Sequence, residues 1–314
     1  MSGTLISGER KPFAAVADWG TTRLRMWLMD AEGRVLGESR GDDGLLSARE
    51  KGFETVLEDH LARLGAPADL PVAICGMAGS RTGWIEAPYM DLPAGLETIV
   101  AAAVPVPAQR RIIMLPGVAR RDETAPDVMR GEETQLLGLV RAGFRNAVVV
   151  MPGTHSKWAR LADGVLADYR TFMTGELFAL LKEKSVLVAA LEGAGPVDPA
   201  IAGFAGGVRA ALDAPEMTAN ALFSLRADWL VHGRAPDEGL ARLSGLLIGL
   251  EIAGGSRLYG GTDTVVLLAD GAMGALYARA LGIAGLEIDR VEADELARDG
   301  LFMAARHAFG GIAR

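Results

Sequence analysis

The chain has 314 residues, of which half are hydrophobic and 23% are charged, with a formal net charge of −8. This composition excludes a disordered chain, and the length exceeds what one hydrophobic core usually supports, so two domains are expected. Positive charge forms no stripe along the sequence, which argues against nucleic acid as a partner. The single cysteine, Cys75, excludes an intramolecular disulfide and a cysteine-based metal site.

Targeting signals are missing from the sequence as given. The first 13 residues hold no apolar core of signal-peptide length, and every apolar run is too short to cross a bilayer. One lone cysteine also suits a reducing compartment. We therefore expect a cytoplasmic protein with no membrane partner, present as a monomer or a homodimer.

The first half of the chain begins with three strand-like segments at residues 13–17, 23–29 and 34–36, which tight turns separate. Such spacing predicts an antiparallel meander. A helix is expected over 49–64, because its apolar residues recur on one face. A strand at 72–75 then enters a glycine-rich segment, 76–84. A proline-rich connector at 104–109, a strand at 112–115 and a helix at 131–143 follow.

The second half repeats the first pattern. An apolar strand at 147–151 leads into another predicted meander, where Gly20-Thr21 and Asp30 align with Gly153-Thr154 and Asp163 at a constant offset of 133 residues. An internal duplication is the simplest interpretation. Helices at 174–191 and 237–258, a strand at 264–269 and helices at 273–282 and 292–309 complete the chain. We expect domains at 1–130 and 131–314.

The two Gly-Thr turns are the candidate phosphate sites, since the sequence holds no G-x-x-x-x-G-K-[ST] motif. A glycine-tipped turn lets backbone N–H groups approach an anion, and threonine hydroxyls add donors. Asp18, at the preceding strand end, suits a hydrated Mg²⁺ ion. Ordinary hairpin turns are the alternative. The phosphate-binding candidates are Gly20, Thr21, Thr22 and Arg23 in the first turn, with Gly153, Thr154, His155 and Lys157 in the second.

A third nucleotide element is predicted where the strand at 264–269 runs into Asp270-Gly271-Ala272 and then a helix. Small residues at such a turn let a base and ribose lie against the backbone. Many α/β proteins have similar turns for packing alone.

Glu132 and Glu133 open the helix at 131–143. Acids at a helix N-terminus are favourable for the helix dipole alone. Adjacent helical residues point about 100° apart, so only one of the two is expected to face the cleft, where it would act as general base. Arg130, beside them, is a candidate for binding a carboxylate with two hydrogen bonds.

Substrate contacts are expected in two loops. Loops at strand ends carry function in α/β folds. Gly79, Ser80 and Arg81 are candidates for holding an anionic sugar acid with Trp84 as an apolar wall, although a connector with a buried tryptophan is equally compatible. Arg170, Thr174 and Glu176 form the second group, and Thr174 is also a candidate helix N-cap.

Six motifs together resemble the 2-dehydro-3-deoxygalactonokinase family: ADWGTTRLR, GMAGSRTGW, MRGEETQLLG, MPGTHSKW, TFMTGEL and LSGLLIG. The resemblance covers nearly the whole chain, from about residue 14. This family is similar to the sugar kinase, heat-shock protein 70 and actin superfamily. It implies an α/β fold of two ribonuclease-H-like domains around a central cleft.

The resemblance also implies the reaction. ATP, with Mg²⁺, would phosphorylate the C6 hydroxyl of 2-dehydro-3-deoxy-D-galactonate, a step of galactonate breakdown. Glu133 aligns with a catalytic Glu of related exopolyphosphatases and is favoured over Glu132. Two positions depart from the superfamily pattern: Met151 stands where many members carry Asp, and Asp270-Gly271 stands where Gly-Gly is usual.

Other functions compete with this one. The nearest enzymatic alternatives are a kinase of another 2-keto-3-deoxy sugar acid and an exopolyphosphatase-like phosphohydrolase. A non-enzymatic alternative is an actin-like assembly or sugar-sensing protein. Galactonate and gluconate derivatives differ at one hydroxyl, which the sequence does not resolve.

Overall fold

The computed structural model describes residues 10–261 and 264–310. Packing divides the chain into two compact units. The first unit comprises residues up to 145 with 164–166 and 294–314, and the second comprises 146–163 and 167–293. This grouping places α4 (Glu132–Arg141) and almost all of α11 (Ala293–Phe309) in the first unit. The predicted domain boundary after residue 130 stays a prediction.

A mixed sheet with the strand order β3-β2-β1-β4-β8-β7 forms the centre of the first unit. β1 pairs antiparallel with β2 and parallel with β4, which in turn pairs parallel with β8. This register sets Asp18 beside Cys75 where β1 and β4 end. The strands are β1 (Pro12–Trp19), β2 (Leu24–Asp30), β3 (Val35–Gly41), β4 (Val72–Gly76), β7 (Val104–Pro105) and β8 (Ile112–Met114).

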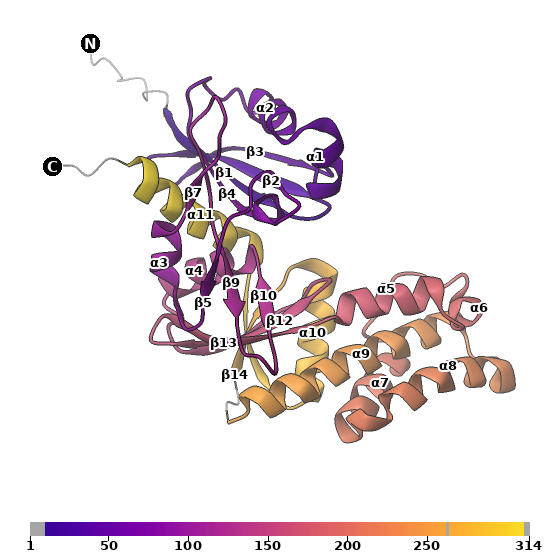
Figure 1. The fold of residues 1–314 in the computed structure, drawn as a ribbon. Coiled ribbons are helices and arrows are strands. Elements are labelled where there is room, and N and C mark those ends of the chain that lie inside the picture. The colour runs from indigo at the N-terminus through magenta and orange to yellow at the C-terminus, as the bar shows by residue number, and fades with distance from the viewer. Residues whose placement is uncertain (1–9, 262–263, 311–314) are drawn as a thin grey trace, which may run out of the picture. The chain divides into compact units, whose positions relative to one another are not determined.

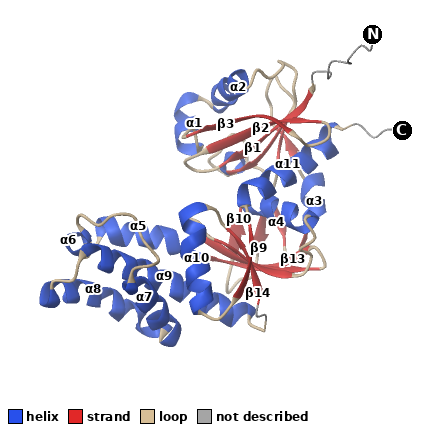
Figure 2. Ribbon diagram, turned by 180° about the vertical axis from the view of Figure 1, so that it is seen from behind, coloured by secondary structure: helices blue, strands red, loops and turns tan. Residues whose placement is uncertain are grey.

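Helices cover both faces of this sheet, with α2 on one side and α11 on the other (Figure 2). The α2 side holds a core in which Trp19, Leu57 and Ile74 are fully buried. A small second sheet has the order β10-β9-β5. The remaining elements of this unit are α1 (Leu45–Lys51), α2 (Phe53–Arg63), the 3-10 turn η1 (Met77–Gly79), β5 (Tyr89–Asp91), β6 (Ala94–Gly95), α3 (Leu96–Ala101), β9 (Gly117–Arg120) and β10 (Asp127–Met129).

The sheet of the second unit repeats this plan. Its order β15-β14-β11-β12-β13 matches β8-β4-β1-β2-β3, with the same antiparallel hairpin and the same parallel neighbours. The predicted duplication is therefore confirmed at the level of topology, as is the α/β class with two ribonuclease-H-like halves. The strands are β11 (Ala147–Met151), β12 (Ser156–Ala162), β13 (Val165–Phe172), β14 (Thr264–Leu268) and β15 (Glu287–Val291).

The second unit differs by a helical layer between β13 and β14, in which α5, α7, α8 and α9 lie together (Figure 1). Glycines bring α7 and α9 into close contact, since a Cβ on Gly245 would lie 2.2 Å from the Phe204 carbonyl oxygen. The helices are α5 (Thr174–Lys184), α6 (Val188–Leu191), α7 (Ala202–Asp213), the 3-10 turn η2 (Pro215–Met217), α8 (Thr218–His232), α9 (Pro236–Tyr259) and α10 (Gly271–Ile283).

Most predicted elements are confirmed within one to four residues. There are exceptions. The helices predicted over 49–64 and 174–191 are each two helices, divided at Gly52 and at residues 185–187, and the connector at 104–109 begins with the short strand β7. The helices α7 and α8 were not predicted. None of the helices in the described part of the chain has both the length and the apolar character that a membrane span requires.

Candidate active site

Asp18 occupies the carboxyl end of β1, next to the end of β4. One carboxylate oxygen accepts a hydrogen bond from Arg25 at 2.6 Å, and the other lies 3.8 Å from the Cys75 thiol. The Cys75 side chain also shares a hydrogen bond with Thr134. Burial raises the pKa of the Cys75 thiol, and the nearby charges of Asp18 and Glu133 raise it further. The fold thus gathers Asp18, Cys75 and the start of α4 at one edge of the sheet.

The two candidate phosphate-binding turns, residues 20–23 and 153–157, are named the first and second phosphate turns. The first one is closed by its own backbone. Gly20 N–H donates to the Arg23 carbonyl at 2.9 Å, so this group is used within the turn. Thr21, Thr22 and Arg23 all carry exposed side chains. An anion at this turn would therefore meet the threonine hydroxyls and Arg23, rather than the glycine N–H.

The two acids of α4 have different surroundings, as expected for adjacent helical residues that point about 100° apart. Glu133 is fully buried, and both of its oxygens accept the Gly131 N–H, at 2.9 and 2.8 Å. Burial, followed by the charge of Glu132, raises the pKa of Glu133 to about 8. Glu132 is half-buried and accepts the Arg130 N–H at 3.1 Å. The raised pKa of Glu133 suits a general base near neutral pH.

The Arg130 guanidinium is buried but only partly satisfied. Its side chain is 8% exposed, one nitrogen donates to the Ala87 carbonyl at 2.8 Å, and the group lies 4.2 Å above the Tyr89 ring. Within residues 10–261 and 264–310, its Nε and Nη1 have no hydrogen-bond partner. Gly79 lies against Nη1, which a Cβ there would approach to 3.1 Å.

The glycine-rich segment 76–84 divides into buried and exposed parts. Ser80 is 8% exposed, and its hydroxyl also lacks a partner among the described residues. Arg81 is exposed. Trp84 stacks on Phe53 at 5.9 Å and meets Trp19 edge-on at 6.3 Å. This packing against the core favours the structural alternative for Trp84.

The second phosphate turn is also closed on itself, because Gly153 N–H donates to Ser156 Oγ at 3.4 Å. Thr154 and His155 are exposed. Lys157 is 4% exposed and donates to the His155 carbonyl at 3.2 Å, which keeps its ammonium group at the turn. The N-terminus of α5 packs on the same turn: Glu176 N–H donates to the Thr154 carbonyl at 3.0 Å, and the Glu176 carboxylate bonds the His155 ring at 2.6 Å.

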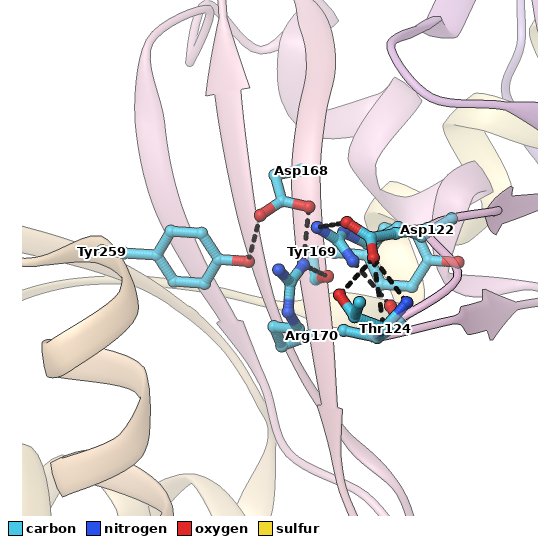
Figure 3. A network of polar contacts seen from close by, with 8 residues as sticks. Asp122, Thr124, Asp168, Tyr169, Arg170 and Tyr259 are labelled. Carbon is cyan, nitrogen blue, oxygen red and sulfur yellow. Dashed lines mark hydrogen bonds and ion pairs between the residues drawn. The ribbon is translucent and has the colours of Figure 1, made fainter.

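The prediction that Thr174 caps α5 is wrong. The N-cap is Met173, without a side-chain cap bond, and Thr174 is already helical, with its hydroxyl bonded to Glu251. Arg170 donates to Asp168 at 2.7 Å, and Tyr259 donates to the other oxygen of Asp168 at 3.3 Å (Figure 3). Glu176 therefore contacts the second phosphate turn, and Thr174 contacts Glu251 behind it. Arg170 belongs to an ion pair with Asp168 on β13.

Asp270, Gly271 and Ala272 form an exposed entry to α10, with Asp270 as N-cap and Gly271 at φ +53°. A largely apolar pocket of about 70 Å³ lies between this helix start and the second phosphate turn. Gly153 of that turn lines the pocket together with residues of α5, α9 and α10, among them Gly175, Leu247, Met273 and Tyr277.

The sequence interpretation missed the buried polar cluster behind the second turn. Glu251, Trp158, Tyr277 and Ser156 share hydrogen bonds of 2.6 to 3.0 Å. A charged residue in the apolar stretch of α9 was the available signal, because carboxylates are rarely buried without partners.

Comparison with known proteins agrees with the motifs. The model of the 2-keto-3-deoxy-galactonokinase family matches residues 18–304. The chain is 47% identical over 296 residues to a probable 2-dehydro-3-deoxygalactonokinase of Rhizobium meliloti, covering 94% of this chain and 97% of that one. It is 33% identical over 285 residues to the 2-dehydro-3-deoxygalactonokinase of Escherichia coli, covering 90% and 94%.

Solved structures extend the likeness to the fold. A crystal structure from Sinorhizobium meliloti, provisionally named as a 2-dehydro-3-deoxygalactonokinase protein, superposes with a TM-score of 0.92 at 46% identity over 95% of this chain and 99% of that one. The activator of the 2-hydroxyisocaproyl-CoA dehydratase from Clostridium difficile, solved with ADPNP, has a TM-score of 0.51 at 12% identity over 96% and 98%, which shows the shared fold alone. The chain belongs to the 2-keto-3-deoxy-galactonokinase family.

Proposed function

We propose that this chain transfers the γ-phosphoryl group of ATP to the C6 hydroxyl of 2-dehydro-3-deoxy-D-galactonate. Its family membership supports the reaction, and one observation carries the substrate class: the buried Arg130 guanidinium, which lies against Gly79, has two nitrogens without a partner among the described residues. Leaving a buried charged donor unpaired costs several kcal/mol, so an anion is the expected partner.

A carboxylate is the anion that fits this site. Nε and Nη1 of Arg130 lie on different edges of the guanidinium, and each edge is completed by one of the two hydrogens of Nη2. Nη2 uses one of these hydrogens on the Ala87 carbonyl, so the other edge can bind a carboxylate with two parallel hydrogen bonds. Ser80 adds a hydroxyl donor that also lacks a partner in the described chain. The sugar acid would thus be held by its C1 end, which leaves the C6 hydroxyl, at the opposite end, for the reaction.

Glu133 is the proposed general base. During the transfer a bond forms between O6 and the γ-phosphorus, the bond from that phosphorus to the bridging oxygen breaks, and the hydroxyl proton passes to the Glu133 carboxylate. Both oxygens of Glu133 accept the Gly131 N–H in this conformation. Catalysis therefore requires one oxygen to exchange this bond for the substrate hydroxyl, which a rotation of the side chain provides.

ATP is proposed to bind in the second unit with its phosphates at the second glycine turn and its base in the pocket beside α10, and the first glycine turn is proposed as a further phosphate-binding element of the first unit. The pocket is apolar, as a flat base requires, and Gly153 of the second phosphate turn contributes to its lining. Exposed Thr21, Thr22 and Arg23 supply donors in the first unit, and Thr154 and Lys157 supply them in the second.

Asp18 is proposed to hold Mg²⁺ through water. One carboxylate fits this ion, because Mg²⁺ keeps several waters and takes its other ligands from the nucleotide phosphates. A protein cage is not expected here, since the described residues include no cluster of three or more metal-binding side chains. The ion would neutralise charge on the phosphate oxygens.

A panel of 2-keto-3-deoxy sugar acids tests this proposal. We expect ADP release to depend on the sugar acid, with 2-dehydro-3-deoxy-D-galactonate turned over best. The gluconate isomer, which differs at one hydroxyl, serves as the matched comparison. ADP release that ignores every sugar acid would instead identify a phosphohydrolase.

A further inference from the structure

Glu251 lies in the middle of α9, is 1% exposed and is nevertheless fully bonded. Trp158 Nε1 donates to one of its oxygens at 3.0 Å, and the Tyr277 hydroxyl donates to the other at 2.6 Å. The Thr174 hydroxyl bonds the same carboxylate. Burial raises the pKa of Glu251, whereas hydrogen bonds from Thr174, Tyr277, Trp158 and Ser156 oppose that shift. Trp158 and Tyr277 thus use both oxygens of the Glu251 side chain as hydrogen-bond acceptors.

From Glu251, hydrogen bonds lead to the backbone of the second phosphate turn. The Tyr277 oxygen lies 2.9 Å from Ser156 Oγ, which accepts the Gly153 N–H at 3.4 Å. Because Tyr277 gives its proton to Glu251, it accepts the proton of Ser156, and Ser156 in turn accepts from Gly153. Every donor points the same way, an order that requires a pure acceptor at the far end.

These contacts join the elements that form the proposed nucleotide site. Trp158 and Ser156 belong to β12, Thr174 opens α5, and Tyr277 belongs to α10. The indole of Trp158 is held tightly as well, since a Cβ on Gly255 of α9 would lie 2.3 Å from it. A shift of α9 at Glu251 would therefore move the turn, the start of α5 and the wall of the base pocket together.

We propose that Glu251 is a positioning residue that fixes the second phosphate turn through Tyr277 and Ser156, and so sets the affinity for nucleotide. This inference rests on the proposed nucleotide site. Glu251 itself touches no phosphate in this scheme, because Tyr277 and Ser156 stand between it and the turn. Its effect should appear in nucleotide binding, while sugar-acid recognition, which is assigned to the first unit, stays the same.

Calorimetric titration with ADP of the wild type and the Glu251→Gln variant tests the proposal. The amide replaces one acceptor by a donor, so either Trp158 or Tyr277 loses its partner. A lost buried hydrogen bond is worth about 1–3 kcal/mol, so we expect the Kd for ADP to rise about tenfold. The KM for the sugar acid should stay within about twofold of the wild-type value, because a twofold change corresponds to less free energy than one hydrogen bond contributes.

Leu225→Ala is the matched control for lost stability. Leu225 is a buried residue of α8 in the helical core of the same unit, outside the phosphate turn and the pocket. Its truncation should lower the melting temperature, since a cavity remains, but leave the Kd for ADP unchanged.

A double-mutant cycle separates a relay from independent packing effects. Ser156 contacts Glu251 directly and through Tyr277, so Ser156→Ala should also raise the Kd about tenfold. The double variant should lose little more than either single variant. If Glu251→Gln does not fold, Ser156→Ala and Tyr277→Phe decide the question in its place.

The outcomes distinguish the two proposals. Wild-type affinity for ADP in the substituted variants, or additive losses in the cycle, would overturn the role of Glu251 and leave the proposed function standing. A wild-type protein that binds no ADP would overturn both.

Discussion

Arg25 reaches back along the β1–β2 hairpin and donates to Asp18 at 2.6 Å, and its other terminal nitrogen bonds Asp294 at the start of α11. Arg40 of β3 contacts the second oxygen of Asp294 at 3.0 Å. The proposed magnesium carboxylate is thus oriented by an arginine that the C-terminal helix holds in place. The end of the chain contributes to a site that begins at residue 18.

Asp18→Asn should lower kcat by about 10²-fold or more, because the amide keeps the size of the side chain but not its charge toward the metal. The melting temperature should fall only modestly, because the amide oxygen of asparagine can still accept the hydrogen bond from Arg25, although the ion pair of this 13% exposed side chain is lost. Steady-state kinetics across a magnesium titration measure the effect.

Arg25→Lys provides the comparison for that variant. Lysine keeps the charge but cannot bond Asp18 and Asp294 at once, so a smaller loss of kcat, about tenfold, is expected. Full activity of Asp18→Asn at ordinary magnesium concentrations would remove the metal role.

Glu133 should impose an acid limb on kcat/KM. With a pKa of about 8, instead of 4.5, the carboxylate is mostly protonated at pH 6 and cannot accept the hydroxyl proton. Activity should therefore rise with pH up to about 8. The Glu133→Gln substitution should lower kcat/KM about 10²–10⁴-fold, and Glu132→Gln should lower it much less. A profile that is flat from pH 6 to 8 would contradict the assignment.

The raised pKa of Glu133 also makes the stability of the folded protein depend on pH. The folded state holds a proton on Glu133 between pH 4.5 and about 8, whereas the unfolded state releases it. Stability therefore falls as pH rises through this window, by up to about 1.4 kcal/mol per pH unit. Denaturant unfolding should show a steeper decline from pH 5 to 8 in the wild type than in Glu133→Gln. Parallel curves would show that Glu133 does not bind this proton.

Arg130→Lys should raise the KM for the sugar acid about 10²-fold, because an ammonium group cannot reproduce two parallel hydrogen bonds to a carboxylate. The KM for ATP should not change. Kinetics with each substrate varied in turn separate the two effects.

Arg110→Lys is the matched control. Arg110 is also 8% exposed, but it bonds Glu58 and the carbonyls of Pro67 and Leu70. Its replacement should cost about 1–3 kcal/mol of stability without changing the KM for the sugar acid. Equal effects of the two substitutions on this KM would mean that Arg130 is only structural.

Gly175→Ala should weaken nucleotide binding. Its Cβ would lie 2.4 Å from the Gly153 carbonyl oxygen, so the start of α5 must move away from the second phosphate turn. We expect the KM for ATP to rise about tenfold or more, the equivalent of one lost contact of about 1.4 kcal/mol.

Gly206→Ala, in the middle of α7, provides the control, because no atom lies within 4 Å of its Cβ. That substitution should stabilise the protein by about 0.5–1 kcal/mol. An unchanged KM for ATP in Gly175→Ala would show that the α5 contact does not shape the nucleotide site.

Much of the fold could be predicted from sequence because its signals are local. Apolar runs bounded by glycine turns defined both meanders, and the Gly-Thr repeat indicated that they were related. The pairing of Asp18 with Arg25 was out of reach, because its support, Asp294, lies 269 residues further along the chain.

Less of the candidate site could be predicted from sequence, because its contacts also join residues far apart in the chain. Helix geometry predicted that Glu132 and Glu133 would differ in their surroundings, whereas the preference for Glu133 came from the family resemblance. Thr174 was expected to cap a helix, but tertiary contact with Glu251 engages its hydroxyl instead. Arg130 was identified by its type and neighbours, whereas its two unpartnered nitrogens became visible only after Ala87 and Tyr89 had packed around it.

Identification of the product tests the central claim most directly. The purified protein is incubated with Mg·ATP and 2-dehydro-3-deoxy-D-galactonate, and the product is analysed by phosphorus–proton correlation NMR. We predict equal amounts of ADP and a sugar phosphate whose phosphorus couples to the two C6 protons. Inorganic phosphate in place of a phosphate ester, at a rate independent of the sugar acid, would contradict it.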